Sequence, residues 1–221
     1  MVAQRPTWGT IDLRRVARSQ VGDLALQANP EKIMADITAV RPQVNLAIMG
    51  KIDDGRDHVS AALSSILEEQ NGVGASRADT DGARGTYPEF RTAVRDYLRF
   101  QVEEQASPTN PSTARADGVL LVLSALEDNT DRFKELVALA RTIGAPAIVV
   151  YINKTDVLDD DGLVGLMEME LREILDKADY PGDTTPIIAG SALQAMSGDP
   201  ANRDRILQLA QALDTTIPQR A

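Results

Sequence analysis

A short motif near the middle of the chain carries side chains whose chemistry suits a guanine base. Asn153, Lys154 and Asp156 follow an apolar run that we expect to be a buried strand, and ligand contacts in an open α/β sheet gather at the carboxyl ends of the strands. Asp156 can accept hydrogen bonds from the ring nitrogen and the exocyclic amine of guanine, a donor pair that adenine does not present. The stem of Lys154 can cover one face of the base, and the Asn153 amide can tie neighbouring loops together.

A second motif, Ser191-Ala192-Leu193, follows the next predicted strand along the chain. The backbone amide of Ala192 can donate a hydrogen bond toward the guanine oxygen. Either motif alone occurs by chance, but the two together at the ends of successive strands form a specific pattern. They predict a guanine-binding site, and the alternative is a surface turn whose charged residues serve only solubility.

The segment from Gly50 to Gly55 has the glycine spacing of the phosphate-binding loop G-x-x-x-x-G-K-[ST], between a predicted strand and a predicted helix. Such glycines let backbone amides surround an anion at the positive end of the helix. However, Arg56 and Asp57 stand where the motif has Lys and Ser or Thr. The planar guanidinium of Arg56 is bulkier than the compact ammonium that reaches the outer phosphates.

Three acidic residues add negative charge to this loop: Asp53, Asp54 and Asp57. Two unit charges about 4 Å apart interact by roughly 4 kcal/mol at an effective dielectric constant of about 20, so repulsion can cancel most of the phosphate affinity. Asp57 avoids this repulsion only if a metal ion intervenes, which makes it the candidate ligand for Mg²⁺. The loop therefore either binds phosphate weakly or has no phosphate role, and its candidate residues are Gly50, Asp53, Asp54, Gly55, Arg56 and Asp57.

The pattern from about Val44 onward alternates strands with helices, which predicts βα units and a largely parallel α/β sheet. The predicted strands span residues 44–49, 118–123, 147–152 and 186–190, and the predicted helices span 59–69, 130–143, 163–178 and 203–213. In the helix at 163–178, helical spacing predicts four apolar side chains that face the core: Leu166, Met169, Leu171 and Leu175.

Other segments have different patterns. Residues 90–102 fit either one helix or two short strands, whereas 71–85 and 103–111 are polar and rich in loop-forming residues. The first 43 residues contain two amphipathic helical patterns, the second with an Asn cap and a Pro in its first turn. We therefore expect a helical extension at 1–43 and a main domain at 44–221.

The composition excludes several classes of function. The 221-residue chain has a formal net charge of −10, which argues against a nucleic-acid-binding surface. It has no Cys and one His, which excludes disulfides, thiolate catalysis and metal sites built from these residues. It contains neither an apolar run long enough for a bilayer nor a signal peptide at Met1, so we expect a cytoplasmic protein without a membrane partner.

The chain resembles the G domain of bacterial translation elongation factor Tu from about Arg41 to Ala221, most closely after Asp117. The landmarks that match are Val44-Asn45, Ala83-Arg84-Gly85-Thr86, Asp117-Gly118, Tyr151–Asp156, Met167–Glu173, Tyr180–Asp183, Gly190–Leu193 and Leu213–Pro218. The resemblance implies a P-loop NTPase fold of the Ras-like G-domain type, with a mostly parallel sheet flanked by helices. It also implies GTP or GDP as the ligand and a guanine role for Asn153, Lys154, Asp156, Ser191 and Leu193.

The departures from the family pattern concern the phosphate end. The P-loop Lys and Thr of the family correspond to Arg56 and Asp57. The switch II histidine of the family, which orients the attacking water, should fall near Glu103, and the segment Glu103–Ser107 contains no His. Phosphoryl transfer by this fold depends on these charge-stabilising groups, and losing one such contact can cost about a hundred- to a thousandfold in rate.

Two functions follow from these observations. The first is a pseudo-GTPase in which guanine nucleotide is bound through its base or not at all and hydrolysis is impaired. Such a protein would act as a regulatory or interaction module, with residues 1–43 as the candidate contact for a protein partner. The second is a slow but genuine GTPase, with Arg56 in the place of the lysine and Asp57 on Mg²⁺.

Overall fold

The structure, a computed structural model, describes residues 41–71, 89–100, 116–127, 129–158 and 161–219. These residues belong to one compact unit, Arg41–Ala221. The N-terminal helices predicted up to residue 40, the loop predicted over 71–85 apart from Asn71 and the polar segment at 103–111 lie outside the described residues.

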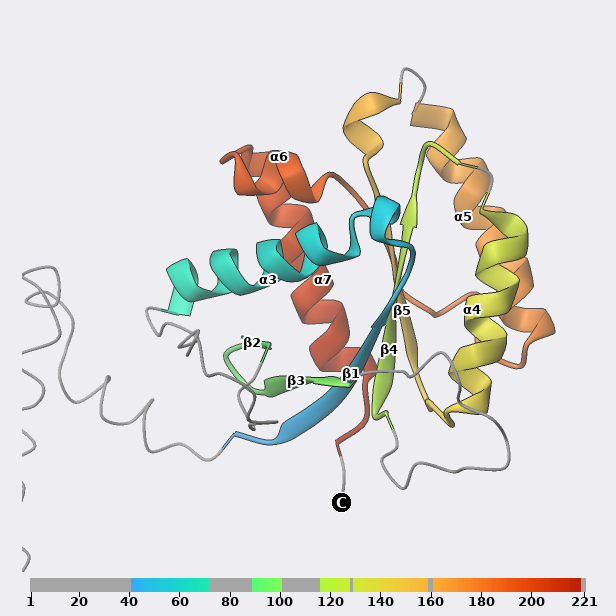
Figure 1. The fold of residues 1–221 in the computed structure, drawn as a ribbon, viewed down its shortest axis with the longest axis horizontal. Helices are drawn as coiled ribbons and strands as arrows, with labels where there is room; N and C mark the ends of the chain where they lie inside the picture. Colours follow the sequence, from blue (N-terminus) through green and yellow to red (C-terminus); the bar gives the residue numbers. More distant parts are fainter. Residues whose placement is uncertain (1–40, 72–88, 101–115, 128, 159–160, 220–221) are drawn as a thin grey trace, which may run out of the picture. The chain divides into compact units, whose positions relative to one another are not determined.

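A six-stranded sheet forms the centre of the described part of the chain, in the order β2-β3-β1-β4-β5-β6 (Figure 1). Its strands are β1 (Gln43–Met49), β2 (Phe90–Arg91), β3 (Asp96–Phe100), β4 (Gly118–Ser124), β5 (Ile148–Asn153) and β6 (Ile187–Ala189). All neighbouring strands run parallel except β2 and β3. The prediction of a mostly parallel α/β sheet is confirmed, and of the two alternatives predicted for residues 90–102 the described part, 90–100, forms two strands.

Helices cover both faces of the sheet (Figure 1). One face packs against α3 (Arg56–Asn71), α6 (Ala192–Met196) and α7 (Pro200–Thr216), and the other against α4 (Thr130–Thr142) and α5 (Asp161–Lys177). Two short 3₁₀ helices, η2 (Ile52–Asp54) and η3 (Thr155–Val157), follow β1 and β5. This three-layer arrangement buries a separate hydrophobic core on each face of the sheet.

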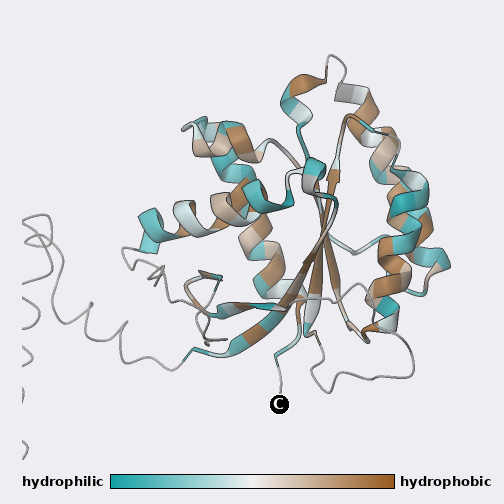
Figure 2. Cartoon of the chain, in the orientation of Figure 1, coloured by the Kyte–Doolittle hydropathy of each residue, from teal (hydrophilic) through white to brown (hydrophobic). Residues whose placement is uncertain are grey.

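The two central strands β4 and β5 are the most enclosed part of the sheet. Every residue of both strands is buried, and Figure 2 shows them as predominantly hydrophobic. Continuous apolar runs are what a parallel strand needs when helices cover both of its faces. These strands therefore hold the residues at their carboxyl ends on a rigid support.

The predicted orientation of α5 is wrong for two of its four apolar residues. Leu171 and Leu175 are buried as expected, but Leu166 is 64% exposed and Met169 is 67% exposed. The buried stripe of α5 follows a different helical register, since its apolar contacts to the core are Val164, Met167, Leu171, Ile174 and Leu175. Leu166 and Met169 lie on the opposite face of the helix from that stripe and reach the surface.

A buried polar cluster joins the β2–β3 hairpin to the end of α7. The Asp214 carboxylate accepts hydrogen bonds from the hydroxyls of Thr92 at 3.0 Å and Tyr97 at 2.8 Å. Arg95 donates to the Ile217 carbonyl at 2.6 Å. Burial raises the pKa of the Asp214 carboxyl and the pKa of the Tyr97 hydroxyl. The cluster fixes β3 against α7 and so positions the side chains that β3 carries.

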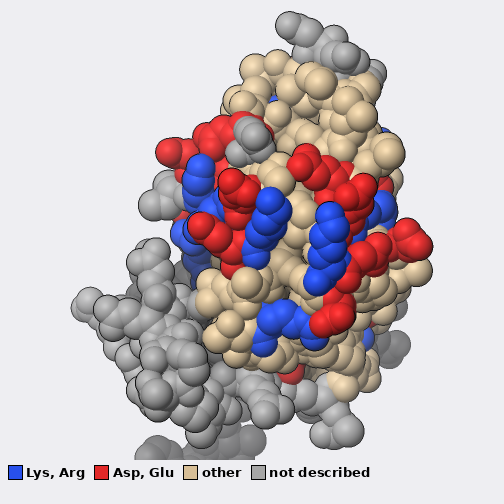
Figure 3. All heavy atoms as spheres, turned by 90° about the vertical axis from the view of Figure 1, so that its right-hand side faces the viewer, with Lys and Arg blue, Asp and Glu red and all other residues tan. Residues whose placement is uncertain are grey.

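The surface formed by α4 and α5 mixes charges of both signs. Figure 3 shows basic and acidic side chains interleaved across this face. Several pair along one helix, among them Arg132 with Glu135 at 2.8 Å and Lys134 with Asp131 at 2.9 Å. Such pairs add little stability. Because acidic side chains lie among the basic ones, this face has no uniformly positive electrostatic potential. Within the described ranges, none of the helices has the length and apolarity needed to cross a membrane.

Candidate functional site

Three loops meet at the carboxyl edge of the sheet. β1 ends at Met49 and leads through Gly50 and η2 into α3, β5 leads into η3, and β6 leads into α6 (Figure 1). Because β1, β4, β5 and β6 are parallel neighbours, their carboxyl ends lie on one side. The two guanine motifs and the phosphate loop predicted from the sequence therefore converge at this edge.

Asn153, the last residue of β5, joins two of these loops. Its Nδ2 donates to the Asp54 carbonyl at 2.9 Å, and its Oδ1 accepts from the Ala192 amide at 3.0 Å. All three residues are buried. Gly55, with φ of 80°, leaves room for the amide, since a Cβ at that position would collide with Asn153 Nδ2. Asn153 thus links the phosphate loop to the second guanine motif, as its side chain chemistry suggested.

Lys154 reaches across the same edge. It has a left-handed backbone conformation, with φ of 64°, and its Nζ donates to the Asp53 carbonyl. The backbone amide of the following residue, Thr155, donates to the Gly190 carbonyl at 3.4 Å. The extended Lys154 stem is therefore held between the phosphate loop and η3, where an aliphatic surface can lie against a planar ring.

The remaining guanine candidates differ in their exposure. Asp156 is exposed and Leu193 is 57% exposed, so both are accessible to a ligand. Ser191 is buried, and its hydroxyl accepts from the Gln194 amide at 3.2 Å, which caps α6. The Ala192 amide, which we expected to face guanine, donates to Asn153 in this structure. For this amide to contact guanine, it would have to leave Asn153 or share its hydrogen between Asn153 and the base.

The acidic residues of the phosphate loop occupy different environments. Asp53 is exposed, whereas Asp54 is fully buried and its Oδ2 accepts from the Lys51 amide at 2.8 Å. Its other carboxylate oxygen has no hydrogen-bond partner among the described residues. Burial raises the pKa of the Asp54 carboxyl, and the bond from the Lys51 amide opposes that shift. The Asp54 charge therefore lies beneath the loop.

Lys51 is held at the rim of the loop by a residue that the sequence did not indicate. Its Nζ lies 2.9 Å from Glu127 Oε2, beyond the end of β4. This pairing lowers the pKa of the Glu127 carboxyl and raises the pKa of the Lys51 ammonium. The lysine of this loop is therefore paired with a carboxylate of the protein itself.

Asp57, in the first turn of α3, lies between two guanidinium groups. Its Oδ1 is 3.4 Å from Arg56 Nε and 3.3 Å from a terminal nitrogen of Arg99 on β3. Arg99 also pairs with Glu89 at 3.6 Å, and Ser60 of α3 donates to the same Glu89 carboxylate. Sequence reasoning missed Arg99 and Glu89 because both lie outside any recognisable motif.

The described residues around Asp57 place cationic side chains, not further oxygen ligands, beside its carboxylate. Mg²⁺ requires an octahedral shell of oxygen ligands and usually binds one or two carboxylates together with substrate phosphates. The Oδ1 oxygen of the Asp57 carboxylate instead faces Arg56 and Arg99. In the part of the chain that the structure describes, no group of three or more His, Cys, Asp and Glu residues could hold a metal.

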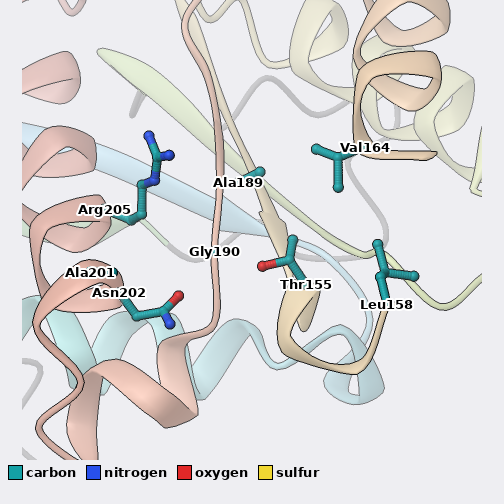
Figure 4. A pocket seen from close by; sticks show the side chains of 8 residues that line it. All are labelled: Thr155, Leu158, Val164, Ala189, Gly190, Ala201, Asn202 and Arg205. Carbon is teal, nitrogen blue, oxygen red and sulfur yellow. The ribbon is translucent and has the colours of Figure 1, made fainter. Parts of the chain in front are cut away.

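A pocket lies beside the guanine motifs, at the outer edge of the sheet. It has a volume of about 290 Å³ and is lined by Thr155, Leu158, Val164, Ala189, Gly190, Ala201, Asn202 and Arg205 (Figure 4). In Figure 4, Arg205 and Asn202 on α7 lie across from Thr155 and Leu158. The pocket includes Thr155 and Gly190 from the two guanine motif loops, but none of the six guanine candidates lines it.

The fold and this edge together define a G domain of the P-loop NTPase class: a mostly parallel sheet, a glycine loop between β1 and α3, and guanine motifs after β5 and β6. The family model of the elongation factor Tu GTP binding domain matches residues 104–219, more than half of the chain. The chain belongs to this family. The matched range contains both guanine motifs, and the phosphate loop at 50–57 precedes it.

Removing the Asn153 side chain should loosen both loops. We expect Asn153→Ala to lower the free energy of unfolding by about 1–3 kcal/mol, because the Asp54 carbonyl and the Ala192 amide stay buried without partners. Urea denaturation measures this loss, and hydrogen exchange should accelerate at residues 50–55 and 191–193. The control is Asn71→Ala at the end of α3, which removes one bond of 3.4 Å to the Arg91 carbonyl. Equal losses in both variants would contradict the central role of Asn153.

Proposed function

We propose that this protein is a guanine-nucleotide-binding pseudo-GTPase that acts as a regulatory or interaction module. The observation that carries the proposal is the pairing of Arg56 with Asp57 at 3.4 Å, at the two positions where a P-loop has its lysine and its metal-binding hydroxyl. The guanine end, by contrast, is assembled around Asn153. Affinity would then come from the base more than from the outer phosphate.

The proposed binding residues are Asn153, Lys154, Asp156, Ser191, Ala192 and Leu193. The exposure of Asp156 beside the ordered Lys154 and Asn153 supports this assignment, because a ligand can reach the carboxylate that distinguishes guanine from adenine. A bound base would cover the Asp156 carboxylate, and a base that leaves the covered carboxylate unpaired is then strongly disfavoured. Base selectivity is therefore the property that the site residues should control.

Binding of GDP but not ADP tests the guanine site. We expect isothermal calorimetry to detect GDP binding, and Asp156→Ala to weaken it about tenfold or more, since a hydrogen bond to a charged acceptor is lost. Asp204→Ala, which removes an exposed carboxylate from α7, serves as the matched control and should leave the affinity unchanged. The guanine proposal fails if ADP binds as well as GDP, or if neither binds.

Hydrolysis distinguishes the pseudo-GTPase from the alternative, a slow GTPase that uses Arg56 and a metal on Asp57. We expect phosphate release from GTP to stay at the rate of the protein-free solution, with or without Mg²⁺, because the charge-stabilising groups are replaced. Asp57→Ala should then change nothing. Phosphate release that depends on Mg²⁺ and responds to Asp57→Ala would instead establish the enzyme.

The interaction role concerns protein partners and residues 1–43. It is supported by the two amphipathic patterns in that segment and by the exposed apolar side chains of Leu163, Leu166 and Met169 on α5. A cytoplasmic location fits this role and stays a prediction.

Affinity purification with the full chain and with a chain that starts at Arg41 tests the role of the N-terminal segment. The shorter chain keeps β1, which begins at Gln43, and the whole compact unit. We expect a partner that the full chain retains and the shorter chain loses, because the amphipathic segment would supply the contact. Identical profiles for the two chains would remove residues 1–40, and with them both amphipathic patterns, from the proposal.

A further inference from the structure

Asp57 occupies the position at which a P-loop presents a hydroxyl to Mg²⁺. In that class of site the ion bridges the phosphates and neutralises their charge. A carboxylate at the same position adds a negative charge, which must be neutralised before phosphates can approach. The structure supplies that neutralisation from the protein itself, through Arg99.

Arg99 reaches Asp57 from a different part of the fold. It lies on β3, next to β1 in the sheet, and its guanidinium is 3.3 Å from Asp57 Oδ1. The second nitrogen of the fork is 3.6 Å from the Glu89 carboxylate. Glu89 is held in turn by α3, because Ser60 donates to its side chain and Ser64 donates to its carbonyl at 2.6 Å. The cation is thus fixed in place by two carboxylates.

Arg99 remains accessible while it is held. Its side chain is 37% exposed, and that of Asp57 is 60% exposed. A guanidinium carries its charge at every pH that proteins experience, and its planar fork matches the oxygens of a phosphate. It needs none of the coordination geometry that Mg²⁺ demands.

We propose that Arg99 takes the place of the divalent cation beside Asp57, so that the phosphate end of this site excludes Mg²⁺ and receives nucleotide phosphates without it. The part that concerns nucleotide rests on the proposed function, whereas the exclusion of the cation does not. The alternative is that these contacts are ordinary surface ion pairs, which contribute little stability. Such pairs would neither exclude Mg²⁺ nor receive the phosphates of a nucleotide. The two explanations differ in what Arg99→Gln does.

The nucleotide experiment uses a fluorescent N-methylanthraniloyl derivative of GDP with the full chain, in EDTA or in MgCl₂. The wild-type protein should bind it with affinities that agree within about twofold in the two buffers. In EDTA, Arg99→Gln should weaken binding about tenfold, because a charged hydrogen-bond donor to phosphate is lost. MgCl₂ should then restore part of the affinity of Arg99→Gln, because Asp57 keeps only its contact with Arg56 at 3.4 Å and can bind the ion. Arg203→Gln, which breaks an exposed pair with Glu69, is the matched control and should behave as wild type.

A second readout needs no nucleotide. Electron paramagnetic resonance of added Mn²⁺ should show the ion free with the wild-type protein and bound by Arg99→Gln, with binding lost again when Asp57→Asn is added. The proposal is overturned if Mn²⁺ binds wild type and Arg99→Gln alike, or binds neither. It is also overturned if Mg²⁺ strengthens wild-type nucleotide binding tenfold or more, or if Arg99→Gln matches Arg203→Gln. If no variant binds GDP, the proposed function fails, and the Mn²⁺ measurement alone decides the role of Arg99.

Discussion

The arrangement of the candidate site depends on one buried amide, that of Asn153. Its two hydrogen bonds reach the Asp54 carbonyl and the Ala192 amide, which lie 99 and 39 residues away in the sequence. Buried polar backbone groups need partners, so neither loop can move away without leaving one unsatisfied. Because β5 is fully buried, the amide sits on a rigid support, and the loops after β1 and β6 take their positions from it.

The guanine end and the phosphate end are held by different kinds of interaction. Hydrogen bonds among backbone groups and the Asn153 side chain form the guanine end, whereas ion pairs of Lys51, Arg56, Asp57 and Arg99 form the phosphate end. Substitution of a charged residue changes an ion pair but leaves backbone hydrogen bonds intact. The family match covers residues 104–219, which contain both predicted guanine motifs, and the loop at 50–57 precedes it.

The sequence predicted the elements whose signals are local. The apolar runs of β4 and β5 and the motif that begins at Asn153 identified the sheet, its parallel direction and the place of the guanine candidates. The partners of the phosphate loop were not predictable, because Arg99 lies 42 residues from Asp57 and Glu127 lies 76 residues from Lys51. Such pairs form only when the strand order brings β3 and β4 beside β1. The error at Leu166 and Met169 has a related cause, since several apolar stripes fit α5 and only packing on the sheet selects one.

The electrostatics of the phosphate loop also differ from what its composition indicates. The sequence of the loop contains three carboxylates that could repel a phosphate. One of them, Asp54, is buried beneath the loop, where burial raises the pKa of its carboxyl. Asp57 faces two guanidinium groups. Among the described residues, Asp53 is the one exposed acid of this loop that forms no ion pair, and its carbonyl accepts a hydrogen bond from Lys154. Repulsion is thus weaker than a count of charges predicts, while the compensating cations are shared with protein carboxylates. Under the proposed function, such a loop gains little affinity from each additional phosphate, so GDP and GTP should bind about equally and the base should supply most of the affinity.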